Sequence, residues 1–90
     1  MKIGIFGING KMGSLLADEI LKDDSLILLW GIDPVNYNSY KDVPVYSSLE
    51  KATVPDCIID FSHHTHIKVI LDYAKKNKFF IVLIYPMEYR

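Results

Sequence analysis

A glycine-rich segment near the N-terminus constrains the fold of this 90-residue chain more than any other feature. Glycine recurs at every third position, at Gly7, Gly10 and Gly13. Before it, residues 2–7 form a short apolar run that is typical of a buried strand. After it, residues 11–22 carry apolar side chains at helical spacing: Met12, Leu15, Leu16, Ile20 and Leu21. A strand, a tight turn and a helix in this order predict the start of a β-α-β unit.

The rest of the chain extends this unit. Further apolar runs predict buried strands at 25–32, 56–61 and 79–85, a short edge strand at 43–46 and a second long helix at 62–76. Residues 36–42 are polar and aromatic without a period, which indicates a loop, and Ser47 and Glu50 fit a helix capping box. Continuous apolar strands are typical of parallel sheets buried on both faces. We predict an α/β fold: a doubly wound parallel sheet, Rossmann-like but incomplete, with about four to five strands and helices on both faces.

The glycine segment is placed where a phosphate-binding loop must lie, between the first strand and the first helix. Gly7 allows a tight turn, Gly10 leaves no Cβ in the way of a pyrophosphate, and Gly13 lets the helix pack close to the sheet. Asn9 replaces the second glycine of the common dinucleotide fingerprint, and asparagine tolerates left-handed backbone. The predicted cofactor-binding residues are Gly7, Ile8, Asn9, Gly10, Lys11, Met12 and Asp33.

Asp33 ends the second predicted strand, 26 residues after Gly7. This is near the spacing of about 20 residues at which an acid bonds the ribose of a dinucleotide. The alternative is a turn aspartate in front of Pro34. No lysine or arginine follows until Lys41, so a ribose 2′-phosphate would find a carboxylate and no nearby cation. The sequence therefore predicts NADH in preference to NADPH.

Composition excludes several classes of protein. A net charge of −1 argues against a nucleic-acid or membrane-surface partner, and a single cysteine, Cys57, excludes an internal disulfide. The apolar run at the N-terminus is too short for a signal peptide, so we expect a cytoplasmic protein. Three histidines, at 63, 64 and 66, resemble a metal cluster, but only two of them can meet on one helix face. We expect them to be polar residues at a helix start, and Cys57 to be an inert core residue.

Four segments resemble the bacterial 4-hydroxy-tetrahydrodipicolinate reductase (dihydrodipicolinate reductase) family of lysine and diaminopimelate biosynthesis. They are Gly7–Gly13, Gly31–Asp33, Val45–Leu49 and Cys57–His63, and the likeness extends to about residue 83. The resemblance implies an NAD(P)H-binding domain whose residues 7–12 bind the pyrophosphate and whose Asp33 binds the adenosine ribose. It also implies a second domain that carries the substrate and the catalytic residues.

The chain departs from that family in two places. His64 replaces a usual proline, and Ile84–Met87 replaces a Thr-Thr-Gly loop that lies beside the nicotinamide. We therefore expect residues 1–90 to be a truncated dinucleotide-binding domain without the substrate domain and without catalysis of its own. The alternatives are a free-standing nucleotide-binding or sensor module and an inactive gene remnant. Residues 79–84 are uncharged and apolar, which predicts self-association through an exposed edge strand.

Overall fold

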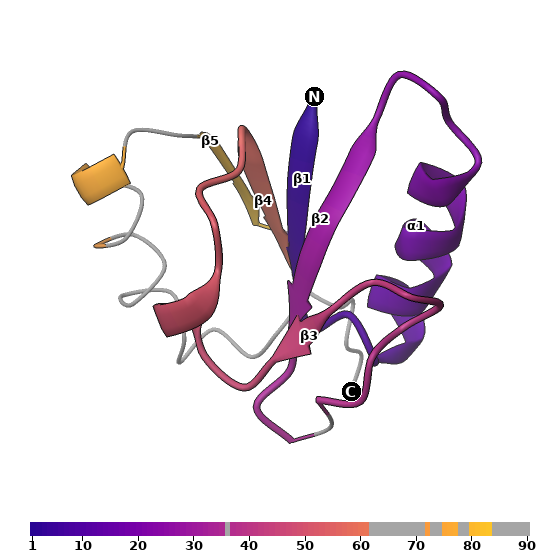
Figure 1. The fold of residues 1–90 in the computed structure, drawn as a ribbon, viewed down its shortest axis with the longest axis horizontal. Helices are drawn as coiled ribbons and strands as arrows, with labels where there is room; N and C mark the ends of the chain where they lie inside the picture. The colour runs from indigo at the N-terminus through magenta and orange to yellow at the C-terminus, as the bar shows by residue number, and fades with distance from the viewer. Residues whose placement is uncertain (36, 62–71, 73–74, 78–79, 84–90) are drawn as a thin grey trace, which may run out of the picture.

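The chain forms a five-stranded sheet in which every pair of neighbouring strands is parallel. The computed structural model describes residues 1–35, 37–61, 72, 75–77 and 80–83. The strands are β1 (Lys2–Phe6), β2 (Ile27–Ile32), β3 (Val45–Tyr46), β4 (Cys57–Asp60) and β5 (Phe80–Leu83). Their order across the sheet is β3-β2-β1-β4-β5, which places β1 at the centre (Figure 1). The predicted doubly wound α/β class is confirmed.

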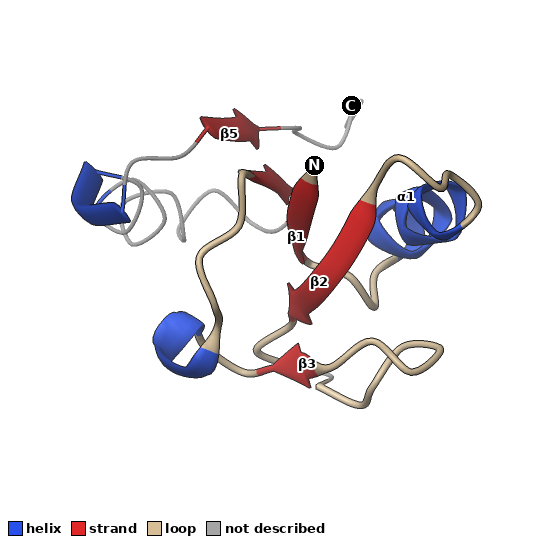
Figure 2. Ribbon diagram, turned by 45° about the horizontal axis from the view of Figure 1, so that its top comes forward, coloured by secondary structure: helices blue, strands red, loops and turns tan. Residues whose placement is uncertain are grey.

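Helix α1 (Lys11–Leu21) covers one face of this sheet, and the 3-10 helix η1 (Leu49–Lys51) lies on the other (Figures 1 and 2). Residues 72 and 75–77 are also helical and lie on the side of η1. They fall at the end of the second predicted helix, and the rest of that helix, together with the histidines at 63, 64 and 66, is outside the described residues. Helices on both faces are the arrangement that right-handed crossovers impose on parallel strands.

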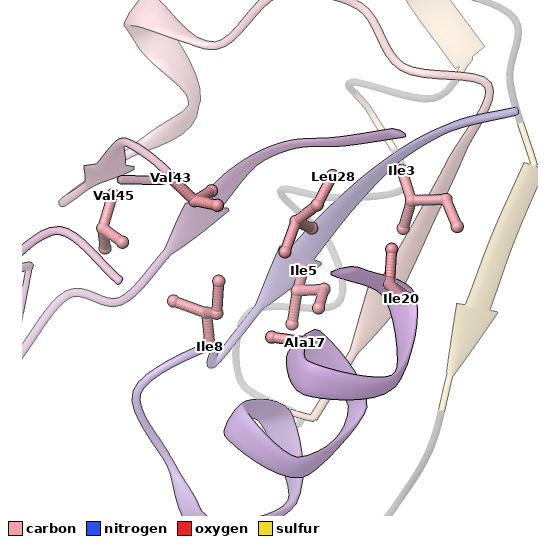
Figure 3. Close-up of a cluster of buried hydrophobic side chains, with 8 residues drawn as sticks. All are labelled: Ile3, Ile5, Ile8, Ala17, Ile20, Leu28, Val43 and Val45. Atoms are coloured by element: carbon pink, nitrogen blue, oxygen red, sulfur yellow. The ribbon is translucent and has the colours of Figure 1, made fainter. Parts of the chain in front are cut away.

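The core has two parts, one on each face of the sheet. On the α1 face, the side chains of Ala17 and Ile20 point from the helix toward Ile5 and Ile3 of β1 (Figure 3). On the other face, Trp30 and Ile58 pack with Leu49 of η1. Trp30 lies flat over Gly4, where an added Cβ would come within 2.5 Å of the indole. Its Nε1 donates to the Thr53 carbonyl at 2.7 Å, so the polar edge of this buried ring is satisfied.

Helix α1 buries a narrower stripe than its sequence predicts. Gly13, Ala17 and Ile20 are buried, whereas Met12 and Leu15 are 51% and 58% exposed. The helix contacts the sheet through these three buried residues, of which Gly13 and Ala17 are small and let it approach closely. Apolar side chains one step around the helix axis therefore stay outside the contact.

Several predicted boundaries shift for local reasons. Strand β2 begins at Ile27 and not at Ser25, because the Asp23 carboxylate accepts bonds from both the backbone and the hydroxyl of Ser25 and forms a turn there. Val43 pairs with Tyr40 in a small antiparallel bridge, which leaves only Val45–Tyr46 in the sheet.

The predicted capping box at Ser47 and Glu50 is wrong. The helical turn there is a single 3-10 turn whose N-cap is Ser48, and that residue makes no side-chain capping bond. With Ser48 as the N-cap, Glu50 occupies the second position of the turn and not the third position that a capping box requires.

Candidate dinucleotide site

The candidate site lies at the carboxyl ends of β1 and β2, where the glycine segment turns into α1. Gly7 has a φ of 90°, a left-handed conformation that favours glycine. Its N–H donates to the Ile32 carbonyl at 2.6 Å, and the N–H of Gly10 donates back to the Gly7 carbonyl at 3.1 Å. The turn off the strand is therefore tight, as its glycines predict.

Gly13 makes the helix approach this turn closely. A Cβ at position 13 would lie 2.9 Å from the Gly7 carbonyl carbon and 3.0 Å from Ile8 Cα, and nearer still to the Gly7 oxygen. Those atoms belong to the backbone and cannot rotate away. A Cβ at Gly10 would meet only the Gly7 oxygen, at 3.3 Å, and otherwise open space. Gly13 thus serves packing, whereas Gly10 keeps the surface of the loop accessible.

Ile8 fixes the loop to the sheet. Its side chain is fully buried and packs over Gly31 of β2, where an added Cβ would lie 2.7 Å from Ile8 Cβ. Its N–H lies 3.4 Å from the Ile32 carbonyl. Of the predicted binding residues, Ile8 is therefore an anchor whose side chain cannot reach a ligand.

The first turn of α1 leaves amides available to an anion. The N-cap is Gly10, which has no side chain to cap the helix, and Ser14 is the first residue whose N–H closes a helical turn, on the Gly10 carbonyl at 3.0 Å. Helix geometry leaves the N–H groups of Lys11, Met12 and Gly13 without partners inside the helix. The same three residues border a cavity of about 280 Å³ that is lined by Gly7, Gly10, Lys11, Met12, Gly13 and Phe61. Free amides and the positive end of a helix dipole together favour a phosphate.

Asp33 directly adjoins this loop. Its Oδ2 accepts the backbone N–H of Asn9 at 3.2 Å, and its Oδ1 accepts the N–H of Val35 at 3.2 Å. The second bond is the turn interaction of the alternative interpretation, so Asp33 both shapes its own turn and contacts the glycine loop. The N–H of Asp33 donates to the Tyr46 carbonyl at 3.0 Å, which fixes this residue to the end of β3.

Asn9 has a role that its sequence position does not indicate. Among the described residues, left-handed backbone outside glycine occurs at Lys41 and Asp42, so Asn9 does not use the left-handed tolerance of asparagine. The Asn9 side chain instead donates through Nδ2 to the Asn38 carbonyl at 3.0 Å. A glycine here would lose this bond to the 33–44 loop.

Tyr40 connects the same loop to α1, which sequence reasoning missed. Its hydroxyl donates to Asp18 Oδ1 at 2.7 Å and lies 3.3 Å from the Ser14 carbonyl. The Lys41 ammonium reaches the same carboxylate oxygen at 2.9 Å. The Tyr40 hydrogen bond and then the Lys41 hydrogen bond lower the pKa of Asp18. The bond to Asp18 raises the pKa of Tyr40 and of Lys41 in turn. No periodicity or motif signals this contact, because its members are 22 and 23 residues apart.

Two other residues with reactive side chains, Cys57 and Asp60, are not among those that line this cavity. Cys57 is buried in β4, and burial, followed by the nearby charge of Asp56, raises the pKa of its thiol, in line with an inert core residue. Asp60 is 3% exposed at the carboxyl end of β4. Within the described segments, no cluster of metal-ligating side chains is found. Nor does any helix in that part of the chain have the length and apolar character needed to cross a membrane.

Comparison with known proteins gives the family. The family profile described as dihydrodipicolinate reductase, N-terminus, matches residues 1–83. The chain belongs to the dihydrodipicolinate reductase family. Curated relatives named 4-hydroxy-tetrahydrodipicolinate reductase include one from Caldanaerobacter subterraneus that is 32% identical over 84 residues. That match covers 92% of this chain and 33% of the relative. Another, from Clostridium novyi, is 29% identical over 83 residues, which cover 91% of this chain and 32% of the relative.

A solved structure of the same family shares the fold. It is a dipicolinate-bound dihydrodipicolinate reductase from Paenisporosarcina sp. TG-14, with a TM-score of 0.77 and 21% sequence identity. The match covers 92% of this chain and 36% of that one. The chain thus spans about a third of the length of these family members, in the N-terminal, nicotinamide-dinucleotide-binding part of the family.

Proposed function

We propose that this chain is the dinucleotide-binding part of a 4-hydroxy-tetrahydrodipicolinate reductase, and that it binds NADH in preference to NADPH. One observation carries the proposal: the Asp33 carboxylate lies on the glycine loop, 3.2 Å from the Asn9 amide. A carboxylate beside a helix start supports the proposal, because the carboxylate can accept bonds from ribose hydroxyls and the helix start suits a pyrophosphate.

In this proposal the residues divide the work. The first-turn amides of Lys11 and Met12 bind the pyrophosphate, Gly10 leaves room for it, and Gly7 sets the turn. Asp33 accepts bonds from the adenosine ribose, and its negative charge disfavours a 2′-phosphate. Ile8 and Asn9 contribute by fixing the loop. The bound nicotinamide dinucleotide would supply the hydride.

The reduction itself is proposed for the whole family protein and not for these 90 residues alone. Hydride transfer needs a bound acceptor held in line with the nicotinamide, and a proton donor. The family members matched here are about three times as long as this chain, so we place the acceptor site in their remaining part. Purified chain should not oxidise NADH when 4-hydroxy-tetrahydrodipicolinate is added, and steady-state turnover would contradict this. We also expect the protein to work in the cytoplasm, without a nucleic-acid or membrane partner.

Calorimetric titration tests the cofactor proposal. Wild-type chain should bind NADH more tightly than NADPH. Asp33→Asn keeps the shape of the side chain and an acceptor oxygen but removes the charge. It should weaken NADH binding and narrow the difference in affinity between NADH and NADPH, because the repulsion of the 2′-phosphate is gone. Asp24→Asn, an exposed charge beyond the C-terminal end of α1, is the matched control. Tighter binding of NADPH by the wild type, or an unchanged ratio in Asp33→Asn, would contradict the assignment.

A further inference from the structure

The 33–44 loop, which connects β2 to β3, is bonded to the glycine loop and to α1 at separate points. Asn38 accepts the Asn9 side chain at 3.0 Å, and Asp33 accepts the Asn9 backbone at 3.2 Å. Further along, the Tyr40 hydroxyl bonds Asp18 of α1 at 2.7 Å. Asn9 is thus held from both its backbone and its side chain by one loop, and that loop is attached to the helix by Tyr40.

The turn that presents Tyr40 is strained. Tyr40 and Val43 exchange backbone hydrogen bonds at 3.0 and 2.8 Å across a two-residue turn. Its central residues, Lys41 and Asp42, have φ values of 46° and 71°. Glycine and asparagine favour such a turn, and lysine there is unfavourable. Strain of this kind persists where the surroundings hold it, and here Val43 is 5% exposed in the core while Tyr40 and Lys41 both bond Asp18.

We propose that Tyr40 is a positioning residue for the adenosine half of the dinucleotide. By holding the loop on α1, its hydroxyl keeps Asn38 and Asp33 in place on Asn9. This inference rests on the proposed function, because it concerns the same site. Tyr40 itself does not touch the ligand. It acts by removing the freedom of a loop that would otherwise have to be ordered when adenosine binds.

Two variants separate this role from general stability. Tyr40→Phe keeps the ring and loses only the hydroxyl, and Asp18→Asn loses the charged acceptor. The matched control is Tyr37→Phe, which removes a hydroxyl from a 60% exposed tyrosine of the same loop. Calorimetry with ADP-ribose and with reduced nicotinamide mononucleotide divides the two halves of the cofactor. We expect Tyr40→Phe to weaken ADP-ribose binding about threefold to tenfold, which is the scale of one net hydrogen bond. The affinity for the mononucleotide should be unchanged.

Amide hydrogen exchange gives a second measurement that needs no ligand. In Tyr40→Phe the Asn9 amide should exchange faster, while the amides of β1 and β4 keep their wild-type rates. A variant that had merely lost stability would accelerate all of them together. If the wild type binds NADH, then an unchanged ADP-ribose affinity or an unchanged exchange rate of the Asn9 amide in Tyr40→Phe would overturn this inference alone. Absence of NADH and ADP-ribose binding by the wild type would overturn the proposed function, and this inference with it.

Discussion

Gly31→Ala is the most informative single perturbation of this site, because one methyl group would displace the anchor of the glycine loop. Built on the present backbone, the new Cβ would lie 2.7 Å from both Cβ and Cδ1 of Ile8, well inside van der Waals contact. Ile8 is fully buried, so its side chain has no open space to enter. Overpacking of this kind costs about 1–3 kcal/mol. Without the clash, replacing a strand glycine by alanine would stabilise the protein by about 0.5–1 kcal/mol. The change in stability therefore has opposite signs with and without a clash against Ile8.

The assay is urea denaturation followed by the fluorescence of Trp30, which is 1% exposed and reports on the core. In a domain of this size, each kcal/mol lost should also lower the melting temperature by about 4–8 °C. Ile8→Ala alone should cost about 2–5 kcal/mol through the cavity it leaves. In the double variant the clash is absent and the new methyl group fills part of that cavity. The double variant should therefore be less destabilised than the sum of the singles by about 1–3 kcal/mol.

Additive effects of the two substitutions, within about 0.5 kcal/mol, would refute the reasoning, as would a Gly31→Ala variant more stable than wild type. The same variant should also bind NADH more weakly, because Ile8 lies between Gly7 and Asn9 and any shift of its side chain moves both. For stability, Gly10→Ala serves as the control, since its Cβ meets one atom at 3.3 Å and the core is untouched.

Three further predictions follow from other parts of the molecule. Gly13→Ala should destabilise the fold despite the higher helix propensity of alanine, because backbone atoms of residues 7 and 8 block its Cβ. Gly10→Ala should keep wild-type stability and lose NADH affinity. The opposite pattern in thermal melting and calorimetry would refute this division of roles. The contact of Tyr40 and Lys41 with Asp18 should weaken in acid, because the pKa of Asp18 in the folded protein is lowered from 3.8. Its contribution to stability is therefore present above that value and is lost as the pH falls through the lower folded pKa. Asp18→Asn should flatten the profile of stability against pH in this range. Strand β5 pairs with β4 on one side and ends the described sheet, so we expect the chain to associate through the outer edge of β5. Light scattering over a range of concentrations should show this association, and Val82→Lys should reduce it, with circular dichroism to check the fold. A wild-type monomer at high concentration would count against the prediction.

The sequence by itself determines the fold class and the position of the candidate site. Apolar runs without alternation require strands buried on both faces, and glycines between a strand and a helix require a tight turn, so both features are local and can be read from spacing. Asp33 is found in the same way, because it follows the second strand. The lengths of the elements were less accessible, since single bonds such as those from Ser25 to Asp23 decide where a strand begins.

Only the tertiary structure decides what the individual residues of the loop do. Gly31 matters because Ile8 lies over it, and Asn9 is fixed by a carbonyl 29 residues away. The contact of Tyr40 with Asp18 joins a strained turn to α1, and the two lie in different elements of the sequence. These are contacts between segments distant in the chain, and neither hydrophobic period nor local propensity carries information on them. Their geometry exists only after the strands have paired and α1 has packed on the sheet.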